Sequence, residues 1–177
     1  MQPLTITRKL FVTPLGDNNH GKTRLIRSVV NHGRRQRLEA VRRGPQHLVT
    51  PWGRVVDALI IPRSFQETLK REYASVLDAL DGVDSEWRTR DLVVFPSHLV
   101  SDDCQAMIAA AHGAGFDAIA ASVVLTAQEI ARHHDCVALR WDERWTLFNT
   151  EATRPDAQLD ALGGDLWTWI AHAGAQR

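Results

Sequence analysis

The stretch GDNNHGKT, Gly16–Thr23, lies between an apolar run and a segment with helical periodicity. Upstream, residues 9–14 (KLFVTP) are rich in β-branched and aromatic side chains and are short enough for a buried strand. Downstream, residues 25–30 place apolar side chains at the spacing of one helical face. The sequence therefore predicts a strand, a glycine-containing loop and a helix in succession, and the helix is expected to stop at residues 31–33 (NHG), with a C-terminal cap there.

The stretch matches the pattern G-x-x-x-x-G-K-[ST], in which backbone N–H groups surround a phosphate and the lysine neutralises it. Lys22 is one of only three lysines among 21 basic residues, so a compact ammonium group at this position suggests a specific requirement. The predicted helix would also direct its positive dipole end and free N–H groups at an anion held by the loop. We therefore expect a phosphate-binding loop.

Residues 10–30 resemble the Walker A segment of the P-loop NTPase superfamily. The resemblance implies that Lys22 contacts the β- and γ-phosphates of a nucleotide and that Thr23 ligates Mg²⁺. It also implies that the loop backbone lines the phosphate over the following residues: Gly16, Asp17, Asn18, Asn19, His20 and Gly21. An exposed loop position, without a specific role, is the favoured interpretation for the histidine.

Strand-like and helix-like segments alternate along the rest of the chain, as they do in α/β proteins with a parallel sheet. Further strands are expected at residues 55–61, 91–95, 116–125 and 136–141, the last with a partner at 145–149. Helices are expected at residues 65–82 and 102–112, after Thr126, and around residues 159–170. The resulting expectation is a three-layer P-loop-like sandwich that forms one domain over residues 1–177.

Catalysis by P-loop enzymes usually requires an acidic residue at the end of an apolar strand, which holds the water shell of the metal. No apolar run in this sequence ends directly in Asp or Glu. Asp57, which follows Val55 and Val56, is ranked first as a substitute, although it can equally mark the solvated start of a strand. The other candidates are the pairs Asp102–Asp103 and Asp142–Glu143.

Ligands of parallel sheets bind beyond the carboxyl ends of the strands, which directs attention to residues 62–64. Arg63 is expected to pair with a phosphate or with a substrate carboxylate. Ser64 and Glu67 have the spacing of a helix capping box, so a structural role is favoured for both.

Residues 33–44 (GRRQRLEAVRRG) contain five arginines and one glutamate. A solvated charged face and an anion-binding lid are both consistent with this composition. In the second case, the stretch Arg34–Arg43 would lie near the phosphoryl acceptor, an anionic small molecule.

The chain has 21 acidic and 21 basic residues, which gives no general field for nucleic acid or for an anionic membrane. No run of apolar residues is long enough to span a bilayer, and residues 1–10 lack the apolar segment of a secretion signal. Cys104 and Cys136 have no metal-binding spacing and are expected to be ordinary core thiols. We therefore expect a cytoplasmic protein without membrane or nucleic-acid partners.

These observations predict Mg²⁺-dependent binding of a nucleoside triphosphate, followed by hydrolysis or by phosphoryl transfer to an unknown acceptor. ATP is the default ligand because no guanine-reading N-K-x-D motif occurs. Catalytic roles are expected for Lys22, Asp57 and Arg63. The alternative is a non-catalytic nucleotide-binding protein that recruits a partner through tryptophans at positions 141, 145, 167 and 169, although core packing is the favoured role of these side chains.

Overall fold

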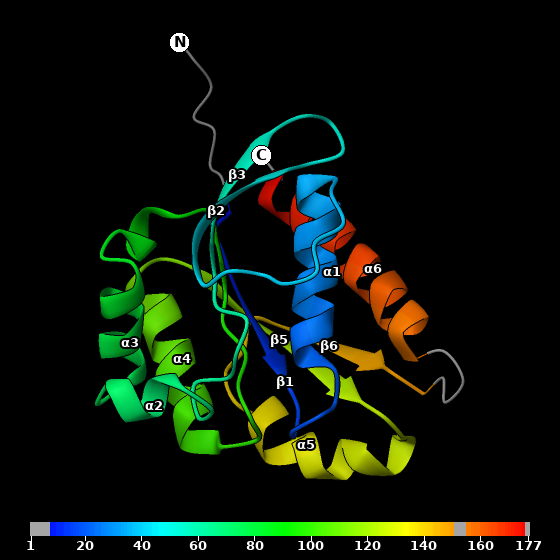
Figure 1. The fold of residues 1–177 in the computed structure, drawn as a ribbon. Coiled ribbons are helices and arrows are strands. Elements are labelled where there is room, and N and C mark those ends of the chain that lie inside the picture. The colour runs from blue at the N-terminus through cyan, green and yellow to red at the C-terminus, as the bar shows by residue number, and fades with distance from the viewer. Residues whose placement is uncertain (1–7, 151–154, 176–177) are drawn as a thin grey trace.

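The computed structural model describes residues 8–150 and 155–175 and has an α/β fold (Figure 1). Its sheet has the order β2-β3-β4-β1-β5-β6, in which β2 alone among these strands is antiparallel to its neighbour. The strands are β1 (Leu10–Leu15), β2 (Gly44–Val49), β3 (Val55–Ile60), β4 (Leu92–Val94), β5 (Asp117–Val124) and β6 (Glu143–Phe148). The helices are α1 (Lys22–Arg34), α2 (Leu69–Glu72), α3 (Val76–Val83), α4 (Ser101–Gly113), α5 (Ile130–Val137) and α6 (Pro155–Ala175).

Helices cover both faces of the sheet and make three layers. Figure 1 shows α1 and α6 side by side on one face, with α3 and α4 on the opposite side of the sheet. Alternate residues of the central strand β1 point into the two cores, with Leu10 and Val12 packed under α1 and α6 and Phe11 packed under α3 and α4. Every residue of β1 is buried, so the 16–23 loop leaves the sheet at its centre.

The two helices on the first face approach each other closely at a pair of glycines in α6. A Cβ atom on Gly163 would lie 2.4 Å from Cβ of Ser28 in α1, and one on Gly164 would lie 2.9 Å from His32. The Ser28 hydroxyl donates a hydrogen bond to the backbone oxygen of Asp160. Small residues at this crossing therefore hold α6 against the helix that carries the loop.

Replacing Gly163 with Ala is expected to destabilise the protein by about 1–3 kcal/mol, because the added methyl overlaps Ser28 and forces the helices apart. Gly113→Ala is the matched control, since its Cβ would meet nothing within 4 Å and alanine favours a helix by up to about 1 kcal/mol. Urea unfolding measures both changes. Equal free energies of unfolding for the two variants would contradict the close approach of α1 and α6 at Gly163.

Several elements differ from the sequence-based expectations. Residues 136–141 do not form a strand, because they complete α5 and the turn before β6. The expected helix over residues 65–82 is divided into α2 and α3, and Ser75 caps α3 by accepting a hydrogen bond from the N–H of Asp78. Strand β2 was not expected, and it lies at the edge of the sheet, where its Pro45 is tolerated.

The first helix was predicted to stop near Gly33, and α1 ends one residue later, at Arg34. Gly33 is buried inside α1, where a Cβ would lie 2.9 Å from the Leu48 side chain of β2. The left-handed cap is instead Arg35. Across the described residues, no helix combines the length and the apolar character needed to cross a membrane.

Candidate functional site

The 16–23 loop connects the carboxyl end of β1 to the first turn of α1. Gly21 precedes the helix with φ of 95°, a left-handed conformation, and a Cβ there would lie 2.7 Å from the Leu159 side chain of α6. Gly21 is therefore constrained both by its backbone angles and by a close neighbour. The first N–H groups of α1 lack partners within the helix and point toward the loop, as the geometry of any helix N-terminus requires.

Lys22 is the first residue of α1, and its ammonium group is folded back into the loop. Its Nζ donates hydrogen bonds to the backbone oxygens of Gly16 at 2.6 Å and of Asp17 at 2.7 Å. Burial lowers the pKa of Lys22 to about 8, against the opposing effect of the charges of Glu67 and Asp17. The loop thus encloses a desolvated cation that, among the described residues, donates its hydrogen bonds to neutral carbonyl groups.

A cavity of about 430 Å³ opens over this end of α1. Its walls come from the loop, from the turn after β3, from the end of β6 and from the start of α6. The lining residues are Asn18, Asn19, Gly21, Lys22, Thr23, Arg24, Arg63, Glu67, Asn149, Pro155, Asp156 and Leu159. This volume lies within the range of sites that bind one small molecule.

Thr23 and Arg63 both lie on this cavity, as the sequence predicts. The hydroxyl of Thr23 donates a hydrogen bond to the backbone oxygen of Pro62 at 3.2 Å, which ties α1 to the turn after β3. The guanidinium of Arg63 lies 3.8 Å from the carboxylate of Glu67, and its side chain is mostly exposed. Arg63 can therefore swing toward an anion in the cavity.

Glu67 lines the cavity, although its sequence context predicted only a structural role. Its Oε1 lies 3.2 Å from Nε2 of His98, while its Oε2 is buried and has no hydrogen-bond partner among the described residues. The capping-box interpretation accounted for Glu67 locally, but the Ser64 hydroxyl makes no hydrogen bond within the part of the chain that the structure describes. The only signal in the sequence was its location shortly after a predicted strand.

Asn149 forms the opposite wall, where β6 ends. Its side chain is buried, and its Oδ1 has no hydrogen-bond partner within residues 8–150 and 155–175. The adjacent Asp156 of α6 forms an ion pair with Arg24 of α1. The cavity lining therefore includes the amide oxygen of Asn149 and the carboxylate of Glu67, together with the ammonium group of Lys22.

Two of the loop's variable positions point away from the cavity and toward α5. The carboxylate of Asp17 pairs with Arg132, and the ring of His20 stacks on that of His133 at 6.4 Å between centroids. His20 is therefore buried, which corrects its expected exposure. Burial and the neighbouring His20 lower the pKa of His133, so the neutral form of that ring is favoured.

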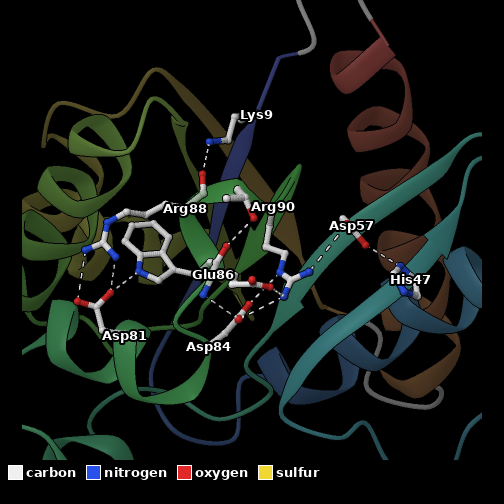
Figure 2. A network of polar contacts seen from close by, with 10 residues as sticks. Lys9, His47, Asp57, Asp81, Asp84, Glu86, Arg88 and Arg90 are labelled. Atoms are coloured by element: carbon white, nitrogen blue, oxygen red, sulfur yellow. Dashed lines mark hydrogen bonds and ion pairs between the residues drawn. The ribbon is translucent and has the colours of Figure 1, made fainter.

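Asp57 lies at the opposite end of the sheet from the loop. The next residue, Ala58, aligns with Leu92 of β4, which in turn aligns with Leu10 of β1. Asp57 therefore lies at the amino ends of these parallel strands. Figure 2 shows its carboxylate between Arg90 and His47, and the His47 pair has a distance of 2.6 Å. The expectation of a metal-site acid at Asp57 is thus corrected, because a residue early in β3 cannot reach a ligand beyond the carboxyl ends.

Asp103 and Asp142, from the two other acidic pairs, also have local partners. Asp103 accepts hydrogen bonds from Gln66 at 2.7 Å and from Lys70 at 3.1 Å, beside the end of β4. Asp142 accepts the N–H of Ala118 at the amino end of β5. These contacts assign Asp103 and Asp142 to structural anchoring.

The arginine-rich stretch lies outside the cavity wall. Residues 35–43 leave the far end of α1 and fold back along it, where Arg27 donates to the backbone oxygen of Glu39. Arg35 donates to the backbone oxygen of Thr50, and Arg43 pairs with Glu72. No arginine between positions 34 and 43 lines the cavity, so the structure gives no support to an acceptor site at this stretch.

Comparison with protein-family models, with curated proteins and with solved structures finds no match to this chain. The chemistry of the site therefore has to be inferred from its own residues.

Proposed function

We propose that this protein binds a nucleoside triphosphate together with Mg²⁺ and cleaves or transfers its γ-phosphoryl group. The observation that carries the proposal is the buried ammonium of Lys22 at the N-terminus of α1, next to a cavity of about 430 Å³. A helix N-terminus and a desolvated lysine both favour an anion, and together they favour a polyanion. Membership of the P-loop NTPase superfamily is part of the same proposal.

The Thr23 hydroxyl at the cavity is an oxygen ligand of the kind that Mg²⁺ binds. Magnesium usually binds one or two protein oxygens and completes its shell with water and substrate phosphates. In the described residues, no group of three or more His, Cys, Asp or Glu side chains is arranged to hold a metal alone, so any Mg²⁺ would share its ligands with the nucleotide. Thr23 would hold it, and when bound the ion would neutralise charge on the phosphate oxygens.

The protein's own groups would position the triphosphate. Lys22 would exchange the carbonyls of Gly16 and Asp17 for phosphate oxygens, and Arg63 and Arg24 would pair with the remaining negative charge. Asn149 would offer its side-chain oxygen Oδ1 to the nucleoside. Catalysis in this arrangement would consist of alignment and charge stabilisation.

The non-catalytic alternative loses the support of its tryptophans. Trp141 is buried in the core that contains Phe11, and Trp167 is buried in the core that contains Val12. Trp145 and Trp169 pack partly buried against the second of these cores, so these four side chains do not form an exposed docking surface. Turnover separates the two functions. Steady release of nucleoside diphosphate from ATP supports the enzyme, and stoichiometric binding without release supports the alternative.

Thr23→Ala is expected to weaken nucleotide binding about tenfold with Mg²⁺ and little with EDTA, because the lost oxygen belongs to the metal shell. Calorimetric titration with a non-hydrolysable ATP analogue under both conditions measures this difference. Thr23→Ser restores the hydroxyl and is the matched control. An equal loss with and without metal would show that the hydroxyl acts through its bond to Pro62 instead.

A further inference from the structure

The neutral total charge of the chain conceals a strong local asymmetry. Residues 24–43 contain seven arginines and one glutamate, so the rest of the chain has an excess of acidic residues. The expectation of no nucleic-acid partner depended on the total, but a polyanion responds to the charge of the face that it meets. The asymmetry predicts one face of the molecule that attracts polyanions.

Three of these arginines lie where α1 ends, and we call Arg34, Arg35 and Arg37 the arginine cluster. All three side chains belong to exposed residues. Within the described part of the chain none of them forms an ion pair with an acid, whereas Arg43 pairs with Glu72. Adjacent positive charges without acidic partners repel each other, and a bound polyanion would relieve that repulsion.

Arg35 connects the arginine cluster to the turn between β2 and β3. Its guanidinium donates hydrogen bonds to the backbone oxygens of Thr50 at 3.1 Å and of Pro51 at 3.2 Å. The next residue, Trp52, is 47% exposed, and its ring packs nearly perpendicular to that of His172 in α6, with 4.8 Å between the centroids. An exposed aromatic ring therefore lies near the arginine cluster, at the end of the molecule where α1 finishes (Figure 1).

An open hollow of about 540 Å³ adjoins the arginine cluster. Its lining includes Arg35, Gln36 and Arg37, together with His32 of α1 and Asp160 of α6 as the one acid. Guanidinium groups suit the phosphate of a nucleotide unit, and an exposed amide suits the edge of a base. This hollow is separate from the cavity at the start of α1.

We propose that this face binds single-stranded nucleic acid. The arginine cluster would pair with successive phosphates, and an unstacked base would stack on Trp52. Residues 24–43 contain no lysine, and arginine is the better residue for paired contacts to phosphate oxygens. The bases of a duplex already stack on each other, so a single exposed ring favours a single strand. The proposal is independent of nucleotide binding at the 16–23 loop.

An anionic membrane is the competing polyanion, and the structure favours it less. Membrane surfaces bind amphipathic helices that present a broad apolar face. Residues 35–43 contain no helix, and their larger apolar side chains, Leu38 and Val41, are half-buried against the core. These residues therefore offer charge without an apolar face to insert.

Fluorescence anisotropy with a labelled oligothymidylate of about 20 nucleotides tests the proposal, without nucleoside triphosphate and over a range of KCl concentrations. Three phosphate contacts should give a slope of about −2 for the logarithm of the affinity against that of the salt concentration. The double variant Arg34→Gln/Arg37→Gln should bring the slope to about −0.7 and weaken binding about 10- to 30-fold near 100 mM KCl. Arg71→Gln/Arg140→Gln removes the same charge from other exposed positions and should change the affinity about twofold at most.

The tryptophan is tested separately. Trp52→Ala is expected to weaken binding about 5- to 100-fold without changing the salt slope, because it removes base stacking and no charge. Trp52→Phe keeps an aromatic face and should recover most of the affinity. An unchanged affinity of Trp52→Ala would overturn the stacking role. Thermal unfolding of every variant checks that the fold is retained.

The remaining outcomes decide the identity of the partner. A wild-type protein that binds neither oligothymidylate nor oligouridylate overturns the proposal, and so does equal affinity for a duplex of the same length. Sedimentation with phosphatidylserine vesicles, without binding of the oligonucleotides, would assign the face to a membrane instead. Lys22→Met should bind the oligonucleotide as the wild type does, and a loss in that variant alone would place the strand at the 16–23 loop and overturn the role of the arginine cluster.

Discussion

Replacing Lys22 with Met is expected to lower the affinity for Mg-nucleoside triphosphate roughly 10- to 100-fold, because a charge-assisted contact with phosphate contributes about 1.5–3 kcal/mol. The fold should survive, since methionine fills a similar volume and removes a buried charge. Isothermal titration measures the affinity, and thermal unfolding of the same samples is the control. Affinity within a factor of two of the wild type would exclude a phosphate site at the loop.

The same lysine should make binding depend on pH. Burial lowers its pKa to about 8, so the free protein carries the positive charge below that pH and loses it above. A bound polyanion favours the charged form, and affinity should therefore fall by about tenfold per pH unit above pH 8. The Lys22→Met variant lacks the titrating ammonium group and should show no such fall. A flat wild-type profile between pH 7 and 9.5 would contradict this account.

Replacing Arg90 with Met is expected to destabilise the fold by about 3 kcal/mol, because it leaves Asp84 buried without its cation. Arg90 Nε donates to Asp84 at 2.9 Å, and the side chains are only 14% and 6% exposed. Figure 2 shows Arg90 between Asp84 and Asp57, at the end of the sheet away from the cavity. Nucleotide affinity should therefore be unchanged.

Arg88→Met is the matched control, since Arg88 pairs with Asp81 on the same stretch but both side chains are nearly half exposed. Its cost should stay below about 1 kcal/mol. Urea unfolding at several pH values measures both variants. The hydrogen bond from Arg90 lowers the pKa of Asp84. The pair therefore stabilises the fold at pH values above the ordinary carboxyl pKa, and that contribution is lost as pH falls through the lowered pKa of Asp84.

The difference in free energy of unfolding between Arg90→Met and the wild type should therefore become smaller at acidic pH. If the two arginine variants cost the same at neutral pH, burial does not distinguish these ion pairs and the network in Figure 2 is only a surface feature.

Local patterns predicted much of the chain's architecture. The apolar β1, the loop with Gly16 and Gly21, and the helical face of α1 were all expected, because each depends on residues close together in the sequence. The alternation of strands and helices also implied a largely parallel sheet. The predicted end of the first helix missed by one residue, since α1 runs to Arg34 and its left-handed cap is Arg35.

The sequence by itself determined which residues lie where β1 meets α1, and the structure accordingly places Lys22 and Thr23 on the cavity. Only the tertiary structure decided which acids accompany them. Asp57 lies near the amino end of β3, and the cavity lies beyond the carboxyl end of the same strand, so most of the strand separates them. The turn after β3 instead brings Glu67 to the cavity. His20 likewise turned inward because α5 packs beneath the loop. Such juxtapositions depend on strand order and helix packing, which no local pattern of residues encodes.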